Sequence, residues 1–225
     1  MHGSKSYSLH METHAVLAGD IVGSTKLGSA VTDKSLDCLM TAALQIGGWD
    51  TAHTRFTRFR GDGWQFYLNR PGLSLHATLL LLARLKAARV GAETRIAVGF
   101  GTVERLGTVD LSDAAGEAFE LAGEALDTLP RPKRVALANR TILHEWHHAL
   151  FDLAVWVASR WSAEQAEAVA LAIDPIRRPT QAEIANDLGI TRQAVQLRLR
   201  SAGWDALQAS LEAMLRHNWM PHVDD

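Results

Sequence analysis

The sequence predicts an α+β fold in which strands and helices share one sheet, followed by an all-helical C-terminal part. Short apolar runs typical of buried strands alternate with amphipathic helical patterns over residues 14–140. From Ile142 onward the helical pattern continues without a strand signal. Strands mixed with helices predict an α/β sandwich, and the change of pattern predicts a second, all-α unit behind it.

The expected elements follow in a regular order. Strands are expected at residues 14–19, 54–60, 64–68, 95–101 and 134–138. Apolar residues spaced by three and four predict helices around residues 36–44 and 75–85, and a third helix over residues 114–129. The apolar face of the first of these helices is expected to comprise Leu36, Leu39, Met40, Ala43 and Leu44.

Composition limits the class of protein. The chain has 225 residues, of which 47% are hydrophobic and 21% charged, so it can bury a packed core. The net charge of -2 gives the whole chain no preference for nucleic acid, and any basic surface must be local. The single cysteine, Cys38, excludes a disulfide framework and suits a reducing cytoplasm. Residues 1–13 are expected to be a flexible polar leader, and no run reaches the ~18 apolar residues of a membrane span.

Two acidic residues stand at the ends of strand-like segments. Asp20 ends the first apolar run, and Asp62 lies in a tight turn between two strands. A buried carboxylate needs a partner or a metal, and two carboxylates on neighbouring strand ends would form an oxygen-ligand site for Mg²⁺ or Mn²⁺. The alternative is that Asp20 caps the following turn through the amides of Gly23 and Ser24.

Two motifs carry a family resemblance: Gly61-Asp62-Gly63 and Gly19-Asp20-Ile21-Val22-Gly23-Ser24-Thr25. Over residues 14–140 the chain resembles the class III nucleotide cyclase homology domain. It looks closest to the small prokaryotic SatD-like members, which carry a helix-turn-helix after the cyclase-like part. The resemblance implies a ferredoxin-type α/β sandwich, metal ions held by Asp20 and Asp62, and head-to-tail pairing of two copies. It also implies nucleotide contacts from Arg58, where the family has a lysine, and from Asp113 of an Asp-x-x-Gly pattern.

The chain departs from active relatives at two positions. They carry an asparagine and an arginine where this chain has Glu120 and Glu124. An anionic helix face opposes the charge of a phosphoryl transition state, where losing one donor already costs ~10²–10³ in rate. We therefore expect cyclisation to be lost, and the domain to dimerise and bind a nucleotide or cyclic dinucleotide effector. An active metal-dependent nucleotide cyclase or nucleotide-processing enzyme is the alternative.

Residues 177–220 predict a helix-turn-helix DNA-binding domain, reached through connector helices at residues 141–176. Thr180 and Glu183 are expected to form a capping box, Gly189 the turn, and Thr191 the cap of the second helix. The pattern resembles the helix pair of sigma-factor region 4 and of LuxR-type regulators. Residues 177–204 carry five arginines against two acids, and this local charge attracts DNA phosphates.

The second helix of this pair is expected to enter the major groove. Its outward residues Arg192, Gln193 and Gln196 are of the types that bind base edges. The remaining DNA contacts are expected from Thr180, Gln181, Thr191, Arg198 and Arg200. The expected function is a cytoplasmic, homodimeric transcription regulator that binds double-stranded DNA and no membrane. A helical hairpin that binds protein is the alternative to DNA binding.

Two further features lie in the C-terminal half. The segment His144-Glu145-Trp146-His147-His148 matches the zinc-protease pattern His-Glu-x-x-His, but on a connector helix three such histidines are more often solvated. Several tryptophans, among them Trp146, Trp156 and Trp161, are expected to anchor the connector helix against the DNA-binding helices, with some in a dimer interface.

Overall fold

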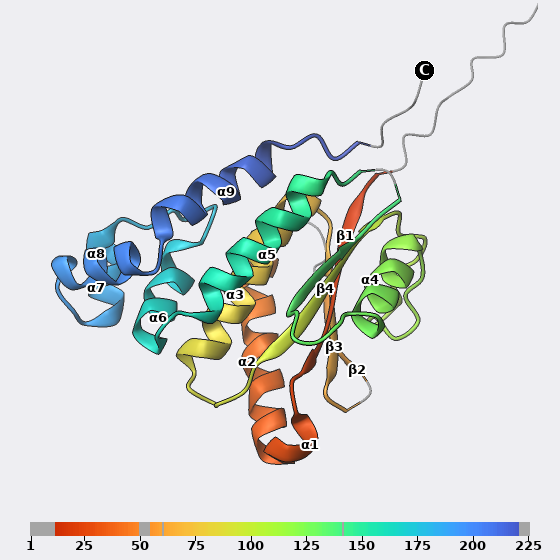
Figure 1. Ribbon diagram of the computed structural model, residues 1–225, viewed down its shortest axis with the longest axis horizontal. Helices are drawn as coiled ribbons and strands as arrows, with labels where there is room; N and C mark the ends of the chain where they lie inside the picture. The colour runs from red at the N-terminus through yellow and green to blue at the C-terminus, as the bar shows by residue number, and fades with distance from the viewer. Residues whose placement is uncertain (1–11, 50–54, 60, 141, 221–225) are drawn as a thin grey trace, which may run out of the picture.

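A computed structural model of the chain describes residues 12–49, 55–59, 61–140 and 142–220, so the predicted leader falls almost wholly outside the described residues. Its centre is a five-stranded sheet in the order β2-β3-β1-β4-β5 (Figure 1). The strands are β1 (His14–Ile21), β2 (Arg55–Phe59), β3 (Gly63–Leu68), β4 (Thr94–Gly101) and β5 (Val135–Ala138). Neighbouring strands run antiparallel, except that β4 and β5 are parallel.

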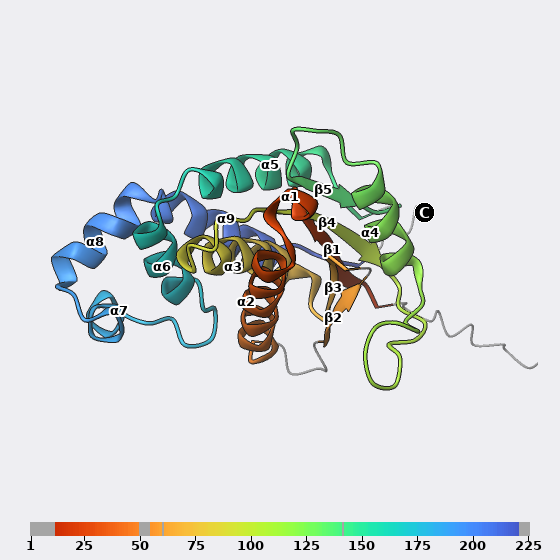
Figure 2. The ribbon, with the colours of Figure 1, turned by 90° about the horizontal axis from the view of Figure 1, so that it is seen from below.

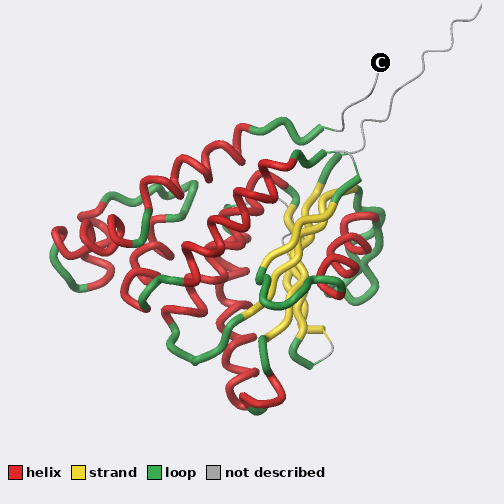
Figure 3. The backbone as a smooth tube through the Cα atoms, viewed as in Figure 1, coloured by secondary structure: helices red, strands yellow, loops and turns green. Residues whose placement is uncertain are grey.

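Helices cover both faces of this sheet (Figure 3). One face carries α4 (Glu117–Asp127), and the other carries α2 (Ser29–Gly47), α3 (Ser74–Ala87) and α5 (Glu145–Ser159). The short helices α1 (Ser24–Leu27) and η1 (Pro71–Leu73) precede α2 and α3. The chain ends in α6 (Ala163–Ala172), α7 (Gln181–Leu188), α8 (Arg192–Ser201) and α9 (Trp204–Arg216). This architecture, a mixed sheet followed by helices, confirms the predicted α+β class.

The alternation of side chains along β1 divides the apolar residues between two cores. Val16 and Ala18 pack with Ala118 and Ala122 beneath α4. Leu17 belongs to the larger core, which lies between the other face of the sheet and α2, α3 and α5. Since both faces of β1 are buried, its sequence is a continuous apolar run rather than an alternating one.

The larger core continues without interruption into the C-terminal helices. Buried residues of α6 to α9 belong to the same cluster as the sheet residues. Trp161 donates a hydrogen bond from Nε1 to the Ala202 carbonyl at 2.9 Å. The ring of Trp219 stacks on Phe100 of β4 with centroids 5.0 Å apart. The boundaries at residues 141–176 and 177–220 stay predictions, but the helices they enclose share their core with the sheet.

Two sequence expectations about helices are wrong in detail. In α2, Met40 and Leu44 are exposed, because the buried face instead includes Thr32 and Ser35. The hydroxyls of Thr32 and Ser35 donate to carbonyls one turn earlier, which allows these polar residues to be buried. The third helix was expected from residue 114, but α4 begins later because Ala115 forms a β-bridge with Arg105.

In the described part of the chain, every helix is too short or too polar to cross a bilayer.

Candidate functional site

Asp20 and Asp62, the predicted metal ligands, belong to the same end of the sheet. Asp20 lies opposite Gly63 of β3 on one side and Arg95 of β4 on the other. The Asp62 carbonyl accepts a hydrogen bond from the Ile21 amide at 3.2 Å. The hairpin and the end of β1 therefore bring the two acidic residues together, as the sequence predicts.

Both carboxylates have protein partners. Arg95 donates from Nε to Asp20 Oδ1 at 2.9 Å and from a terminal nitrogen to Oδ2, and the two side chains are only 22% and 24% exposed. The hydrogen bond to Asp20 raises the pKa of Arg95. Asp62 accepts a hydrogen bond from the Ser24 hydroxyl. The capping alternative for Asp20 is wrong, because both of its carboxylate oxygens accept from Arg95 and α1, which begins at Ser24, has no side-chain cap.

The arginine bears directly on metal binding at this place. Arg95 places a cation against both oxygens of Asp20, where a divalent ion would need them as ligands. The described residues contain no group of three or more His, Cys, Asp or Glu side chains able to hold a metal ion. The donors present do not fit a two-metal centre, and no metal-dependent step follows from this arrangement.

Arg58, predicted to contact a nucleotide, lies on β2 and faces α2. It donates to the Asp33 carbonyl at 3.0 Å and forms ion pairs with the carboxylates of Asp33 and Asp37 at 3.5 and 3.4 Å. The neighbouring residue Thr57 points to the other face, where it accepts a hydrogen bond from the Leu111 amide at 2.8 Å.

Asp113, the second predicted nucleotide contact, lies in the segment between β4 and α4. Its side chain is exposed, and its carbonyl accepts a hydrogen bond from Arg105 Nε at 2.7 Å. This segment runs along the face of β2 to which Thr57 points, whereas Arg58 points to α2. The structure therefore does not bring Arg58 and Asp113 together.

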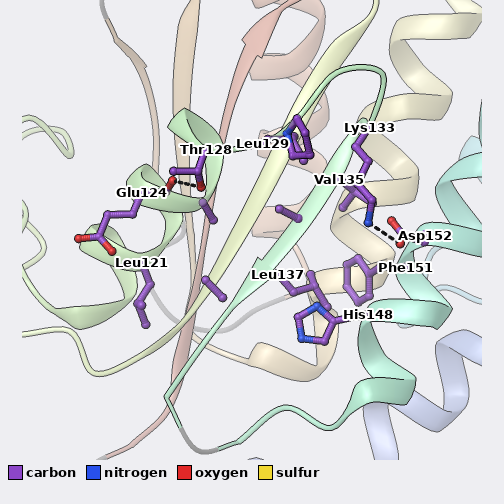
Figure 4. A pocket seen from close by; sticks show the side chains of 14 residues that line it. Leu121, Glu124, Thr128, Leu129, Lys133, Val135, Leu137, His148, Phe151 and Asp152 are labelled. Carbon is purple, nitrogen blue, oxygen red and sulfur yellow. Dashed lines mark hydrogen bonds and ion pairs between the residues drawn. The ribbon is translucent and has the colours of Figure 1, made fainter.

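Glu120 and Glu124 are exposed on α4, and Glu124 lies at the rim of a groove of about 490 Å³. Figure 4 shows this groove between α4, β5 and α5, with His148 on the side opposite Glu124. Its floor is largely apolar, and the Lys133–Asp152 ion pair at 3.0 Å lies across from α4. Leu129 lines the groove, and its carbonyl accepts a hydrogen bond from Arg95 at 3.4 Å, so one end of the groove adjoins the Asp20 ion pair.

The helix pair has the caps that the sequence predicts. The Thr180 hydroxyl accepts from the Glu183 amide at 3.3 Å, and Glu183 accepts from the Thr180 amide at 2.7 Å. Gly189 ends α7 in the left-handed region at φ 64°. Thr191 caps α8 through the Ala194 amide at 3.1 Å. α7 and α8 lie at the end of the molecule farthest from the sheet (Figure 2).

The predicted DNA contacts divide into two groups. Arg192, Gln193, Gln196 and Arg200 form the exposed outer side of α8. Gln193, Gln196 and Arg200 lie on the face away from the buried Val195 and Leu199, and Arg192 is the first residue of the helix. Arg192 and Arg200 have no ion-pair partner in the part of the chain that the structure describes. The other group is engaged within the protein: Arg198 pairs with Glu167 at 2.9 Å, the Thr180 and Thr191 hydroxyls serve as caps, and Gln181 lines a cavity beside α9.

Sequence reasoning missed two residues at these places. Arg95 was recognised only as the start of a strand, although an antiparallel partner for β1 would have set it beside Asp20. Leu197 is 68% exposed on the outer side of α8, among the predicted base contacts. Its apolar side chain is the kind that contacts a thymine methyl group. The signal in the sequence was an apolar residue on a helix face that is otherwise polar and includes Ser201, four residues later.

The zinc-protease pattern does not form a metal site. His144 is the N-cap of α5 with extended backbone, so it does not share a helical face with His148. His147 is fully buried rather than solvated, and its Nδ1 accepts a hydrogen bond from the His144 amide at 2.9 Å. Burial, followed by the charge of His217, lowers the pKa of His147 to about 4.

No protein-family model matches the chain, and no curated protein matches it. Among solved structures, it is similar to the active GGEEF domain of a diguanylate cyclase from Vibrio cholerae, with a TM-score of 0.36 and 13% identity. The match covers 58% of this chain and 85% of that domain. A likeness of this size says nothing about what this chain binds.

Proposed function

We propose that the chain is a sequence-specific DNA-binding transcription regulator whose cyclase-like part serves dimerisation and ligand sensing. The observation that carries this proposal is the outer side of α8. It presents two arginines, two glutamines and one leucine to solvent, on a helix whose start is fixed by a threonine cap. Residues of these types bind base edges and phosphates in the major groove.

The distribution of ion pairs supports this use of α8. Arg177 pairs with Asp187 at 3.1 Å and Arg198 with Glu167, so these two cations are already partly neutralised. Arg192 and Arg200 have no such partner among the described residues, so Arg192 remains to bind a base edge and Arg200 a phosphate. The glutamines between them then lie where base edges would be.

The ligand-sensing part of the proposal rests on the groove between α4, β5 and α5. Its volume of about 490 Å³ lies within the usual 300–1,000 Å³ of small-molecule sites. A nucleotide or cyclic dinucleotide is the proposed effector. Because one end of the groove adjoins the Asp20–Arg95 ion pair, a phosphate there would compete with Asp20 for the guanidinium.

A metal-dependent nucleotide enzyme is the alternative: Asp20 and Asp62 lie close together, but a metal ion there would first have to displace Arg95 from Asp20. Its test is turnover of ATP or GTP in the presence of Mn²⁺. Turnover that Asp20→Ala abolishes would establish this enzyme, and its absence would leave the regulator as the better account.

The DNA-binding proposal is tested by fluorescence anisotropy with a mixed-sequence duplex over a series of salt concentrations. The double variant Arg192→Gln/Arg200→Gln should weaken binding and reduce the slope of log K against log salt by about 1, because one phosphate contact, that of Arg200, is lost. Arg131→Gln/Arg216→Gln removes the same charge at exposed sites outside α8 and should leave the slope nearly unchanged. Equal effects of the two double variants, or no binding by the native chain at low salt, would overturn the proposal.

A further inference from the structure

The outward face of α5 carries a row of partly exposed large apolar side chains. Trp146, Leu153 and Trp156 are 42%, 60% and 56% exposed. Spacings of seven and three residues set them on one face of the helix, together with the exposed Ala149. The opposite face of α5 is buried against α3 and β5. This helix is therefore apolar on both sides, as expected of a helix with a partner on each.

Single exposed apolar residues are common on proteins, but a continuous row of them marks an interface. In Figure 2, α5 runs along the upper side of the molecule, with the other helices and the sheet below it. The apolar surface continues beside Trp156 into a cavity of about 500 Å³ whose lining includes Leu82, Leu85 and Val155. The face of α5 is thus the centre of a wider apolar surface rather than an isolated ridge.

The charges on this face identify the partner. Glu145 is the first residue of α5, and Arg160 follows its last residue, with its guanidinium 4.9 Å from the centroid of the Trp156 ring. Fifteen residues apart on a helix, the two lie ~22 Å from each other and cannot pair within one chain. A second α5 lying antiparallel would set each Glu145 opposite the Arg160 of the other copy, so the face is complementary to itself.

The same alignment also matches the sizes of the side chains. When Glu145 of one copy faces Arg160 of the other, Trp156 faces the small Ala149, and the two Leu153 side chains meet near the two-fold axis. Asp152, the acid next to that axis, is already paired with Lys133 at 3.0 Å. Such an isologous contact is the commonest arrangement of homodimers.

We propose that α5 is the interface between two copies of this chain, packed antiparallel across a two-fold axis. This contact lies outside residues 14–140 and would take the place of the dimerisation proposed for the cyclase-like part, with its head-to-tail pairing; it does not depend on DNA binding. It would also give the proposed regulator two α8 helices related by a two-fold axis, one for each half of an operator.

The test is sedimentation velocity of the full chain without DNA, from 1 to 100 μM. The native chain should sediment as a dimer of about 49 kDa, twice the chain mass of 24.6 kDa. Leu153→Arg should weaken the dimer at least about 30-fold, because it sets two like charges against each other at the apolar centre. Leu44→Arg is the matched control, because Leu44 is 74% exposed on α2 and should leave the dimer intact.

A charge exchange tests the antiparallel alignment separately. Glu145→Arg and Arg160→Glu should each weaken the dimer, and the double variant should recover most of the loss. Circular dichroism and thermal unfolding confirm that each variant is folded. A native chain that is monomeric at 100 μM, or equal effects of Leu153→Arg and Leu44→Arg, would overturn the interface. No recovery in the double variant would overturn the alignment. Since no DNA is present, these results are independent of the anisotropy experiment.

Discussion

Two buried histidines, His76 and His147, should make the fold sensitive to mild acid. His76 lies on α3, is 4% exposed, and its Nδ1 has no hydrogen-bond partner within the described residues. Burial, followed by the charges of Arg178 and Arg70, lowers its pKa to about 4, and the nearby Asp174 only partly opposes this. His147 on α5 has its pKa lowered to about 4 as well.

The sign and size of the effect follow from proton linkage. In the unfolded chain both histidines titrate near pH 6.5, so between pH 6.5 and 4 the unfolded state binds more protons than the folded state. The free energy of unfolding therefore falls as the pH is lowered through this window. At 1.36 kcal/mol per pKa unit, each histidine should cost about 2 kcal/mol between pH 7 and pH 5. Together they should cost about 4 kcal/mol, against a typical total of 5–15 kcal/mol.

Urea unfolding followed by circular dichroism at pH 7 and pH 5 measures this loss. His147→Gln should lose about 2 kcal/mol less than the native chain, because a neutral glutamine replaces one titrating group. Glutamine is also an ordinary third residue of a capping box, so the hydrogen bond from the His144 amide has an acceptor in the variant. His148→Gln, at an exposed histidine, is the control and should lose as much as the native chain.

The reasoning is refuted if His147→Gln and His76→Gln lose as much stability between pH 7 and pH 5 as the native chain does. That result would mean that both imidazoles become protonated in the folded state without cost. Carboxyl groups do not account for the loss in this window, since it lies above their ordinary pKa range.

Three further predictions concern stability. Gly19→Ala should lower the free energy of unfolding in urea by at least about 2 kcal/mol, because the added Cβ would lie 2.3 Å from the Trp64 ring and 2.5 Å from the Arg95 carbonyl. Gly123→Ala, in open space on α4, should raise it by about 0.5–1 kcal/mol, and equal effects of the two variants would contradict the close contact at Gly19. Thr191→Ala should cost about 1 kcal/mol and Thr191→Ser much less, since the cap needs the hydroxyl, and equal losses would dismiss the cap. A double-mutant cycle of Asp20→Asn and Arg95→Gln should give a coupling of about 1–3 kcal/mol, and additivity would show that the ion pair contributes nothing.

The features that the sequence predicts well are set by neighbours along the chain. The strand expected at residues 14–19 depends on a short pattern, and so do the caps at Thr180, Gly189 and Thr191. The structure has the caps at the expected places and extends the strand to Ile21. The overall α+β class follows from the same kind of signal, since strands and helices differ in their period.

The features that the sequence misses depend on contacts between distant segments. Arg95 binds Asp20 because β4 pairs with β1 in one register, and no local pattern fixes that register. His147 is buried because the end of the chain returns over α5, where His217 and Trp219 pack against its ring. Trp146 and Trp156 were expected to be anchors like Trp161, but only Trp161 is buried.

The central claim, that the outer side of α8 binds a defined DNA sequence, is tested most directly by selecting sheared genomic DNA on the purified protein and sequencing what is retained. The account predicts a short motif with two-fold symmetry, lost when Gln193→Ala and Gln196→Ala are combined. Recovery of DNA without a common motif at moderate salt would contradict the claim, and α8 would then be a surface for protein or for non-specific DNA contact.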